Sequence, residues 1–196
     1  APREAVDEVL LFIEGPRATL TVDDRQHEVG PGTIAVLPAG TRATLEPRRS
    51  SPQEEPLFVI VARSLAAGSR GQATAWVAEL GPFAVRPIDP SEPVLSPLIS
   101  LNGRIGLYIV AFPPAGARSP FVGPQVHRLH DQALLVLRGE GNVGLGMTGY
   151  RMQAGSLVLV PAGLPYYMLS DSAEGTLALL IAAPSVAETD VEEQSH

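Results

Sequence analysis

Short apolar stretches, separated by glycine, proline and aspartate, recur along the whole chain. They are rich in Val, Ile and Leu, and stretches of this length and composition are typical of β-strands rather than helices. The pattern predicts strands over 9–13, 18–22, 33–37, 57–62, 74–80, 105–112, 133–137, 156–160 and 176–182. Hairpin turns are expected at Asp23–Asp24 and at Thr148–Gly149. The chain is therefore predicted to be all-β, as a sandwich or a barrel.

Two segments of the chain match each other in the order of their turn residues, and their lengths differ by one residue. Residues 8–40 read EVLLFIEGPRATLTVDDRQHEVGPGTIAVLPAG, and residues 132–163 read QALLVLRGEGNVGLGMTGYRMQAGSLVLVPAG. Gly15 and Gly139 each follow a strand, and the sequence Pro-Ala-Gly occurs late in both segments, at Pro38 and Pro161. A repeat of this quality indicates that one supersecondary unit occurs twice.

These segments resemble the two motifs of the cupin family, and their duplication resembles a bicupin. The first family motif ends in a glutamate, six residues and a glycine, which corresponds to residues 8–15 and, with glutamine in first place, to residues 132–139. The second motif, a glycine, five residues and Pro-x-Gly, corresponds to residues 32–40 and 155–163. The resemblance implies two jelly-roll β-barrels in tandem, of which the first is incomplete and lacks its opening strands.

The prolines between Pro82 and Pro97 mark the expected boundary between the two copies. We expect an N-terminal cupin-like barrel over 1–87, a C-terminal cupin barrel over 88–185 and an acidic tail over 186–196.

Cupins usually hold a metal ion with two histidines at positions i and i+2, the first-motif glutamate and a second-motif histidine. The first copy keeps Glu8 but has Ala43 at the second-motif position, so we expect it to be metal-free. In the second copy the resemblance assigns the four positions to Gln125, His127, Gln132 and Tyr166. No carboxylate and one imidazole remain, and such a set should hold a divalent ion poorly. No metal cofactor is therefore expected.

The register of this assignment has an alternative, because the segment before Gln132 is longer than the family spacing. If the insertion lies just after Pro124 rather than within 118–124, then Val122 and Pro124 take the histidine positions and His127 lies in a loop. In that register His130 and Asp131 would matter more to the site.

The four replacements can still form hydrogen bonds, whereas a barrel kept only as a scaffold would fill more easily with apolar side chains. We predict His127 and Tyr166 as a catalytic acid–base pair, with Gln125, Gln132, His130 and Tyr167 contacting the substrate. His127 and His130 would point to opposite faces of a continuous strand, so we expect at most one of them to face the pocket. Each histidine and tyrosine also has a purely structural interpretation, as a hydrogen-bonded core residue.

Three classes of function remain open. The first is a metal-independent enzyme with isomerase, epimerase or cyclase chemistry in the second barrel. The second is a non-enzymatic bicupin that binds a ligand or is structural. The third is a metal-dependent dioxygenase or decarboxylase, in which His127, His130 and Tyr166 would form a variant iron site.

Composition narrows the partners further. The 196-residue chain has a net charge of −7, all its basic residues are arginine, and it contains no cysteine. Without concentrated positive charge, nucleic acid is not an expected partner, and no apolar run is long enough to cross a membrane. We expect a cytoplasmic bacterial protein that binds a small-molecule ligand. A homodimer is also expected, because the apolar strands 157–160 and 176–182 need covering.

Overall fold

The computed structural model describes residues 6–48, 56–65, 75–81, 95–101, 104–116, 124–185 and 191–193. These ranges contain seventeen strands in four sheets and no helix, so the all-β prediction is confirmed. In the part of the chain that is described, no helix has the length and apolar character needed to cross a membrane. The chain divides into two compact units, Ala1–Arg86 and Pro87–His196.

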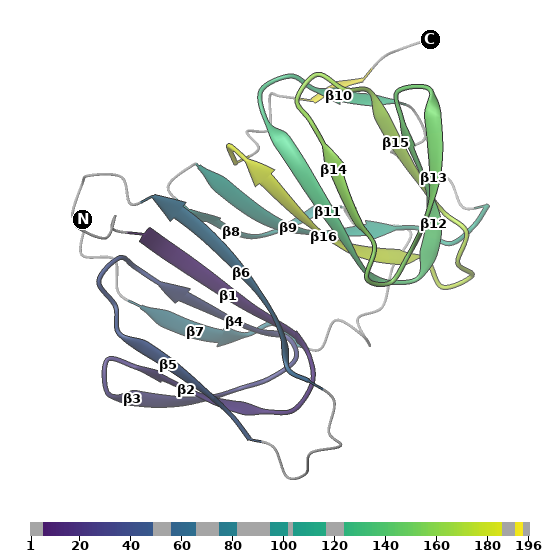
Figure 1. Cartoon of the computed structure of the whole chain (residues 1–196). Helices are drawn as coiled ribbons and strands as arrows, with labels where there is room; N and C mark the ends of the chain where they lie inside the picture. The colour runs from purple at the N-terminus through teal and green to yellow at the C-terminus, as the bar shows by residue number, and fades with distance from the viewer. Residues whose placement is uncertain are drawn as a thin grey trace. The chain divides into compact units, whose positions relative to one another are not determined.

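The first unit contains two sheets (Figure 1). The larger sheet has the order β6-β1-β4-β7, formed by β1 (Val6–Glu14), β4 (Thr33–Leu37), β6 (Phe58–Leu65) and β7 (Trp76–Glu79). The smaller sheet has the order β3-β2-β5, formed by β2 (Ala18–Val22), β3 (Arg25–Val29) and β5 (Ala43–Pro47). Alternate residues of these strands, including Phe12, Leu20 and Leu37, are buried together as the core of the unit. Burial of such side chains is the main stabilising contribution to a sandwich of this kind.

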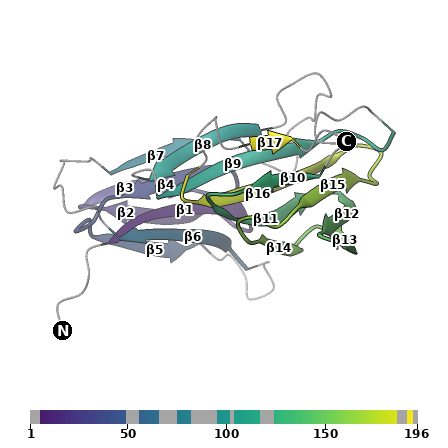
Figure 2. The ribbon, with the colours of Figure 1, turned by 90° about the horizontal axis from the view of Figure 1, so that it is seen from above.

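The second unit contains two five-stranded sheets. The first has the order β14-β11-β16-β9-β8, with β8 (Leu95–Leu101), β9 (Ile105–Phe112), β11 (Asp131–Arg138), β14 (Leu157–Val160) and β16 (Thr176–Ala183). The second has the order β13-β12-β15-β10-β17, with β10 (Gln125–His127), β12 (Glu140–Leu145), β13 (Thr148–Gln153), β15 (Tyr166–Ser170) and β17 (Val191–Glu193). Figure 2 shows β16 between β9 and β11. Leu134 and Val136 from one sheet and Met152 and Met168 from the other belong to one buried core.

The sequence repeat is present as a repeat of strand pairing. β1 pairs with β4 so that Glu8 lies opposite Leu37, and β11 pairs with β14 so that Gln132 lies opposite Val160. In both copies, the residue opposite is the one before the proline of the Pro-Ala-Gly turn. The pairs β1–β6 and β11–β16 also each contain an irregularity at the corresponding place, close to the end of the first strand. The two copies therefore share their register residue by residue.

The glycine after each first strand has a conformation that the fold requires. Gly15 and Gly139 have φ angles of 106° and 86°, in the region that favours glycine. A Cβ atom at Gly15 would lie 2.6 Å from the carbonyl oxygen of Pro56, and one at Gly139 would lie 2.6 Å from that of Gly175. Because both neighbours are backbone atoms, neither position can accept a side chain without moving the returning strand.

The two units differ in the strands that flank the shared ones. Strand β4 of the first unit corresponds to β14 of the second. In the first unit β7 lies beside β4, whereas β14 is the last strand of its sheet among the described residues. In the second unit β9 and β8 extend the sheet beyond β16, and β10 lies beside β15. The described part of the first unit has no counterpart of β8, β9 or β10. This agrees with the prediction that the first barrel is incomplete.

Of the two predicted hairpin turns, one is confirmed and one is wrong. Asp23 and Asp24 form the first turn, with positive φ angles of 42° and 68°. In the second hairpin Leu145 lies opposite Thr148, so the loop consists of Gly146 and Met147. Gly146 supplies the positive φ angle, 58°, that a two-residue loop needs, while Thr148 and Gly149 already belong to β13.

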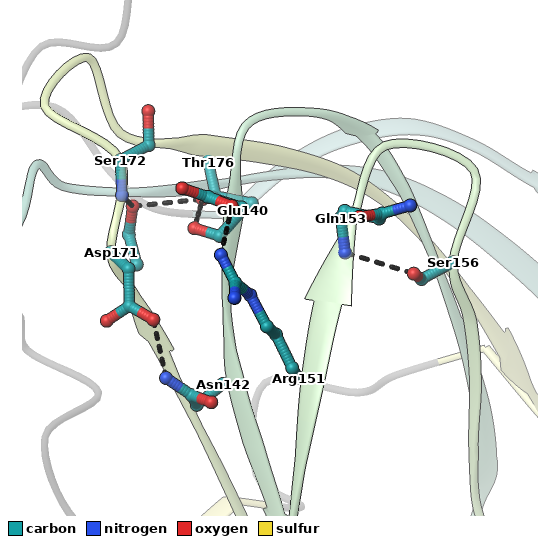
Figure 3. A network of polar contacts seen from close by, with 9 residues as sticks. Glu140, Asn142, Arg151, Gln153, Ser156, Asp171, Ser172 and Thr176 are labelled. Atoms are coloured by element: carbon teal, nitrogen blue, oxygen red, sulfur yellow. Dashed lines mark hydrogen bonds and ion pairs between the residues drawn. The ribbon is translucent and has the colours of Figure 1, made fainter.

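A network of polar contacts connects strands β12 and β13 to the turn before β16 (Figure 3). Arg151 Nη2 donates to Glu140 Oε2 at 2.8 Å, and Asn142 Nδ2 donates to Asp171 Oδ2 at 2.5 Å. The Thr176 hydroxyl donates to the carbonyl oxygen of Glu140 at 2.8 Å. These contacts hold the first residues of β12 in place, while its last residue, Leu145, lies beside the start of β15.

The outward face of β14 is apolar and exposed. Exposure alternates along the strand: Leu157 and Leu159 are 60% and 65% exposed, whereas Val158 and Val160 are buried. An exposed apolar edge of this kind is a feature that proteins usually cover. The homodimer expected from the apolar strands stays a prediction.

Candidate functional site

A cavity of about 70 Å³ lies inside the second unit. Most of its wall is apolar, and the residues that form this part are Leu95, Val110, Phe112, Leu134, Met168 and Leu180. The polar part of the wall is formed by Gln125, His127, Gln132, Tyr166 and Tyr167. At roughly 10–15 Å³ for each water-sized group, this space holds about five such groups.

Three strands bring the predicted site residues together. Gln125 and His127 are two apart on β10 and share a face of the sheet, Gln132 is the second residue of β11, and Tyr166 is the first residue of β15. Gln125 lies opposite Tyr166 in the pairing of β10 with β15. All four side chains are buried, with Gln132 only 3% exposed.

The buried polar side chains form a continuous chain of contacts. His130 Nε2 lies 3.0 Å from His127 Nδ1, and His127 Nε2 lies 3.3 Å from the Tyr166 hydroxyl oxygen. The Tyr166 hydroxyl donates to Gln132 Oε1 at 2.7 Å. Since the hydroxyl proton is used in this way, the Tyr166 oxygen accepts from His127 Nε2–H, and His127 Nδ1 accepts from His130 Nε2–H. The chain therefore runs in one direction, from His130 to Gln132.

The environment of Tyr166 changes its pKa. Burial raises the pKa of Tyr166 above its usual value near 10, against a smaller lowering by the hydrogen bond to Gln132. The phenol is therefore neutral at physiological pH and acts as a hydrogen-bond donor.

His130 lies behind His127 and is not among the residues that line the cavity. Strand β10 ends at His127, and the chain then bends through residues 128–129, so that His130 returns to the first imidazole. The two ring centroids are 4.8 Å apart, and His130 is 1% exposed. Of the two histidines, His127 alone lines the cavity, as expected, but the reason is that the strand stops between them and not that they lie on opposite faces of one strand.

Tyr167 also lines the cavity and is half-buried. It lies opposite Gly144 in the pairing of β12 with β15, and a Cβ atom at Gly144 would overlap the Tyr167 ring. Gly144 within strand β12 therefore indicates that this aromatic side chain approaches the backbone closely.

The amide of Gln132 is only half satisfied. Its Oε1 accepts from Tyr166, but its Nε2 is closed to solvent and has no hydrogen-bond partner among the described residues. Buried donors of this kind are rare in native proteins and are expected to have a partner. At the corresponding position of the first copy, Glu8 Oε1 accepts from Arg63 Nε at 2.7 Å, whereas Gln132 lies opposite Ala182.

Asp131 positions the turn that leads into Tyr166, a role that was not predicted from the sequence. Asp131 Oδ1 accepts from the backbone N–H of Ala162 at 2.8 Å, and the carbonyl oxygen of His127 accepts from Gly163 N–H at 2.8 Å. Asp7 does the same for Ala39 in the first copy. The signal was available in the sequence, because an aspartate precedes the first-motif position in both copies.

Comparison with solved structures identifies the architecture. A Pseudomonas aeruginosa protein named for induction by glyoxylate matches with a TM-score of 0.70 at 19% identity, over 96% of this chain and 70% of that one. A cupin 2 conserved barrel domain protein from Leptotrichia buccalis matches with a TM-score of 0.62 at 15% identity, over 90% and 73%. The chain has the cupin fold. Oxalate decarboxylase from Bacillus subtilis, with a TM-score of 0.59 at 13% identity over 97% and 66%, shares this fold. No protein-family model and no curated protein matches the sequence.

The residues at the metal-ligand positions of the cupin fold do not suit a metal ion here. Two are neutral amides, one is a phenol whose pKa is raised by burial, and the single imidazole contacts His130 and Tyr166 through its two ring nitrogens. Such a donor set lacks the carboxylate and the free imidazoles that divalent ions prefer. Within the described ranges, no three His, Asp or Glu side chains lie close enough to share an ion. These residues therefore do not support a metal-dependent reaction at this site.

Proposed function

We propose that the second unit binds a small molecule in its cavity without using a metal ion, and that the first unit serves as a scaffold. The observation that carries this proposal is the buried Gln132 amide, which lines the cavity and lacks a partner for its nitrogen among the described residues. In this conformation the nitrogen has almost no accessible surface, so a molecule in the cavity can supply that partner once the amide turns toward it. Fold alone does not carry the proposal, since cupin-fold proteins have many functions.

The energetics favour binding over a purely structural role. Four buried polar side chains beside an apolar cavity cost free energy unless each is hydrogen-bonded, and apolar residues of similar size would avoid that cost. In the first copy the position of Tyr166 is occupied by the exposed Ala43, and the described residues of that unit form no such buried network. A polar cluster that the fold does not need is best explained by a ligand.

A second candidate function is acid–base catalysis by His127 and Tyr166, as in an isomerase, epimerase or cyclase. The contact of 3.3 Å between His127 Nε2 and the Tyr166 oxygen favours it, because it is the longest in the chain and the easiest for a substrate to replace. To act as a base, His127 would have to adopt the other tautomer, in which it donates through Nδ1 to His130 Nε2 and keeps the Nε2 lone pair for a substrate proton. Tyr166, which is neutral, would then act as the acid.

Binding is tested with a panel of compounds of about six non-hydrogen atoms, neutral and anionic, by ligand-observed NMR on the full chain. The wild type is compared with Val110→Phe, which fills the cavity, and with Val61→Phe, the same change at an exposed position of the first unit. We expect at least one compound to bind the wild type and Val61→Phe but not Val110→Phe. If no compound distinguishes Val110→Phe from the wild type, the proposal is wrong.

The catalytic candidate has a separate test. Butanone is incubated with the protein in D₂O, and exchange of its α-protons is followed by NMR. Exchange that the protein accelerates, and that His127→Ala and Tyr166→Phe each slow by about tenfold or more, would support acid–base chemistry. Exchange at the same rate in wild type and both variants leaves binding as the function of the cavity.

A further inference from the structure

We propose that the molecule bound in this cavity is neutral, with one oxygen acceptor and a small apolar body, as in an amide, ketone or aldehyde, and that carboxylates are excluded. This inference rests on the binding function proposed above and specifies its ligand class.

The direction of the hydrogen-bonded chain determines which polar function is left for a ligand. His130 donates to His127, His127 donates to Tyr166, and Tyr166 donates to Gln132. Each donor in this series is matched by the acceptor of the next residue, and the series ends with the Gln132 amide. Within this series the group that remains is the Gln132 N–H, which has no partner among the described residues, and the Gln125 amide lines the cavity beside it. The ligand must therefore offer an acceptor.

The charge of the wall decides between a neutral acceptor and an anion. The described residues that line the cavity include no arginine, aspartate or glutamate. The first copy provides a contrast, since Glu8 there pairs with Arg63, whereas the residue opposite Gln132 is Ala182. A carboxylate bound beside Gln132 would be desolvated with no cation opposite it, which is unfavourable.

The size and shape of the wall specify the rest of the molecule. The cavity volume of about 70 Å³ accommodates about five water-sized groups, and six of the lining residues are apolar. A branched three-carbon body attached to one carbonyl group matches this space, with its oxygen toward Gln132 and its methyl groups toward Leu134 and Leu180.

The test compares two probes of nearly identical shape, isobutyramide and isobutyrate, by titration calorimetry or NMR on the full chain. At about pH 8 we expect isobutyramide to bind at least about tenfold more tightly than isobutyrate. Isobutyrate binding should strengthen as the pH falls toward the pKa of its carboxyl group, since its protonated acid is neutral. Isobutyramide binding should stay constant over the same range.

Variants at Gln132 and at the equivalent Glu8 test whether the Gln132 amide binds the ligand. Gln132→Met removes the amide at similar length and should abolish isobutyramide binding, while Glu8→Met in the first copy should leave it unchanged. Equal or tighter binding of isobutyrate at about pH 8, lost in Val110→Phe, would overturn the ligand class and leave the binding function intact. If neither probe gives a signal that depends on the cavity, the ligand class is overturned, and the panel above decides separately on the binding function.

Discussion

The two copies of the repeat hold the same turn with the same hydrogen bonds. Asp7 and Asp131 each accept from the backbone of the Pro-Ala-Gly turn at 2.8 Å. Gly15 and Gly139 each permit a close approach of the strand that returns beside them. At the residue after the aspartate, however, the copies diverge: Glu8 forms an ion pair with a largely exposed arginine, whereas Gln132 is buried. The two copies thus share the same backbone turn although their first-motif side chains have different environments.

The reason for this divergence lies in the flanking strands. In the second unit β8, β9 and β10 contribute Leu95, Val110, Phe112, Gln125 and His127 to the wall around Gln132 and Tyr166. The described part of the first unit has no such strands, so the equivalent position stays partly open to water. An unpaired polar group has a small free-energy cost in water and a large one when it is buried. The buried amide of Gln132 therefore favours a hydrogen-bonding ligand, whereas the partly exposed Glu8 does not.

The largest effect is expected from exchanging the two first-motif residues. Gln132→Glu introduces a buried carboxylate without a cation, and we expect it to lower the free energy of unfolding by about 3 kcal/mol or more at neutral pH. Glu8→Gln removes an exposed ion pair and should cost less than about 1 kcal/mol. Urea denaturation of both variants measures the difference.

The cost of Gln132→Glu should shrink as the pH falls. Burial would raise the pKa of the introduced carboxyl, so that the folded state prefers the protonated form, and the loss of stability appears only as the carboxyl ionises with rising pH. Equal costs for the two exchanges at neutral pH would show that Gln132 is not in a more buried environment than Glu8.

Replacement of the two glycines tests whether the repeat is as symmetric in energy as in geometry. Gly15→Ala and Gly139→Ala each place a side chain at a positive φ angle and against a backbone carbonyl, and each should cost roughly 1–3 kcal/mol. Gly149→Ala serves as a control, because a Cβ atom there meets nothing within 4 Å and its φ angle is not positive. Thermal unfolding of the three variants compares them, and a cost confined to one copy would mean that the other can relax.

The smallest expected effect concerns the Tyr166 hydroxyl. Tyr166→Phe deprives Gln132 Oε1 of its donor, and we expect a loss of about 1–2 kcal/mol at neutral pH. Because burial raises the pKa of Tyr166, its neutral form stabilises the fold below about pH 10, and this contribution is lost as the pH rises further. The wild type should therefore lose stability above about pH 10 more steeply than Tyr166→Phe.

Urea titrations between about pH 8 and pH 11 measure this difference. Tyr150→Phe, at a side chain that is 53% exposed, is the matched control and should follow the wild type. Parallel pH dependence in the wild type and Tyr166→Phe would contradict the role assigned to burial.

The sequence predicted the fold well because strand period and turn residues are local signals. Strands 105–112, 18–22 and 33–37 have the predicted bounds. The repeat predicted that one supersecondary unit occurs twice, and the equivalent registers of β1 with β4 and of β11 with β14 confirm it. The turn at Gly146 and Met147 was missed because the Thr-Gly pair two residues later is an equally typical turn sequence. Strands β3, β5 and β13 were not predicted, since their residues are mostly exposed and lack the apolar pattern. The predicted ranges also leave out β8, β10, β12, β15 and β17.

The site was predictable only where a spacing rule applied. Gln125 and His127 share a face through strand alternation, and the motif register placed Gln132 and Tyr166. The contact between His130 and His127 was not predictable, because it depends on the bend at residues 128–129 rather than on any periodicity. The apolar part of the cavity wall comes from strands distant in sequence, and no local pattern indicates which of their side chains meet.

The pairing of β11 with β16 has a consequence for the speed of folding. This pair joins Asp131 to Ala183 and Gln132 to Ala182, so the chain must close a loop that contains every intervening strand before the central pair of the sheet can form. The pairing of Val6 with Leu65 in β1 and β6 imposes the same requirement on the first unit. Closure of long loops has an entropic cost that is met before the contacts form, and proteins dominated by such pairs refold in milliseconds to seconds. The hairpins β2–β3 and β12–β13, whose partners are adjacent in sequence, are expected to form first.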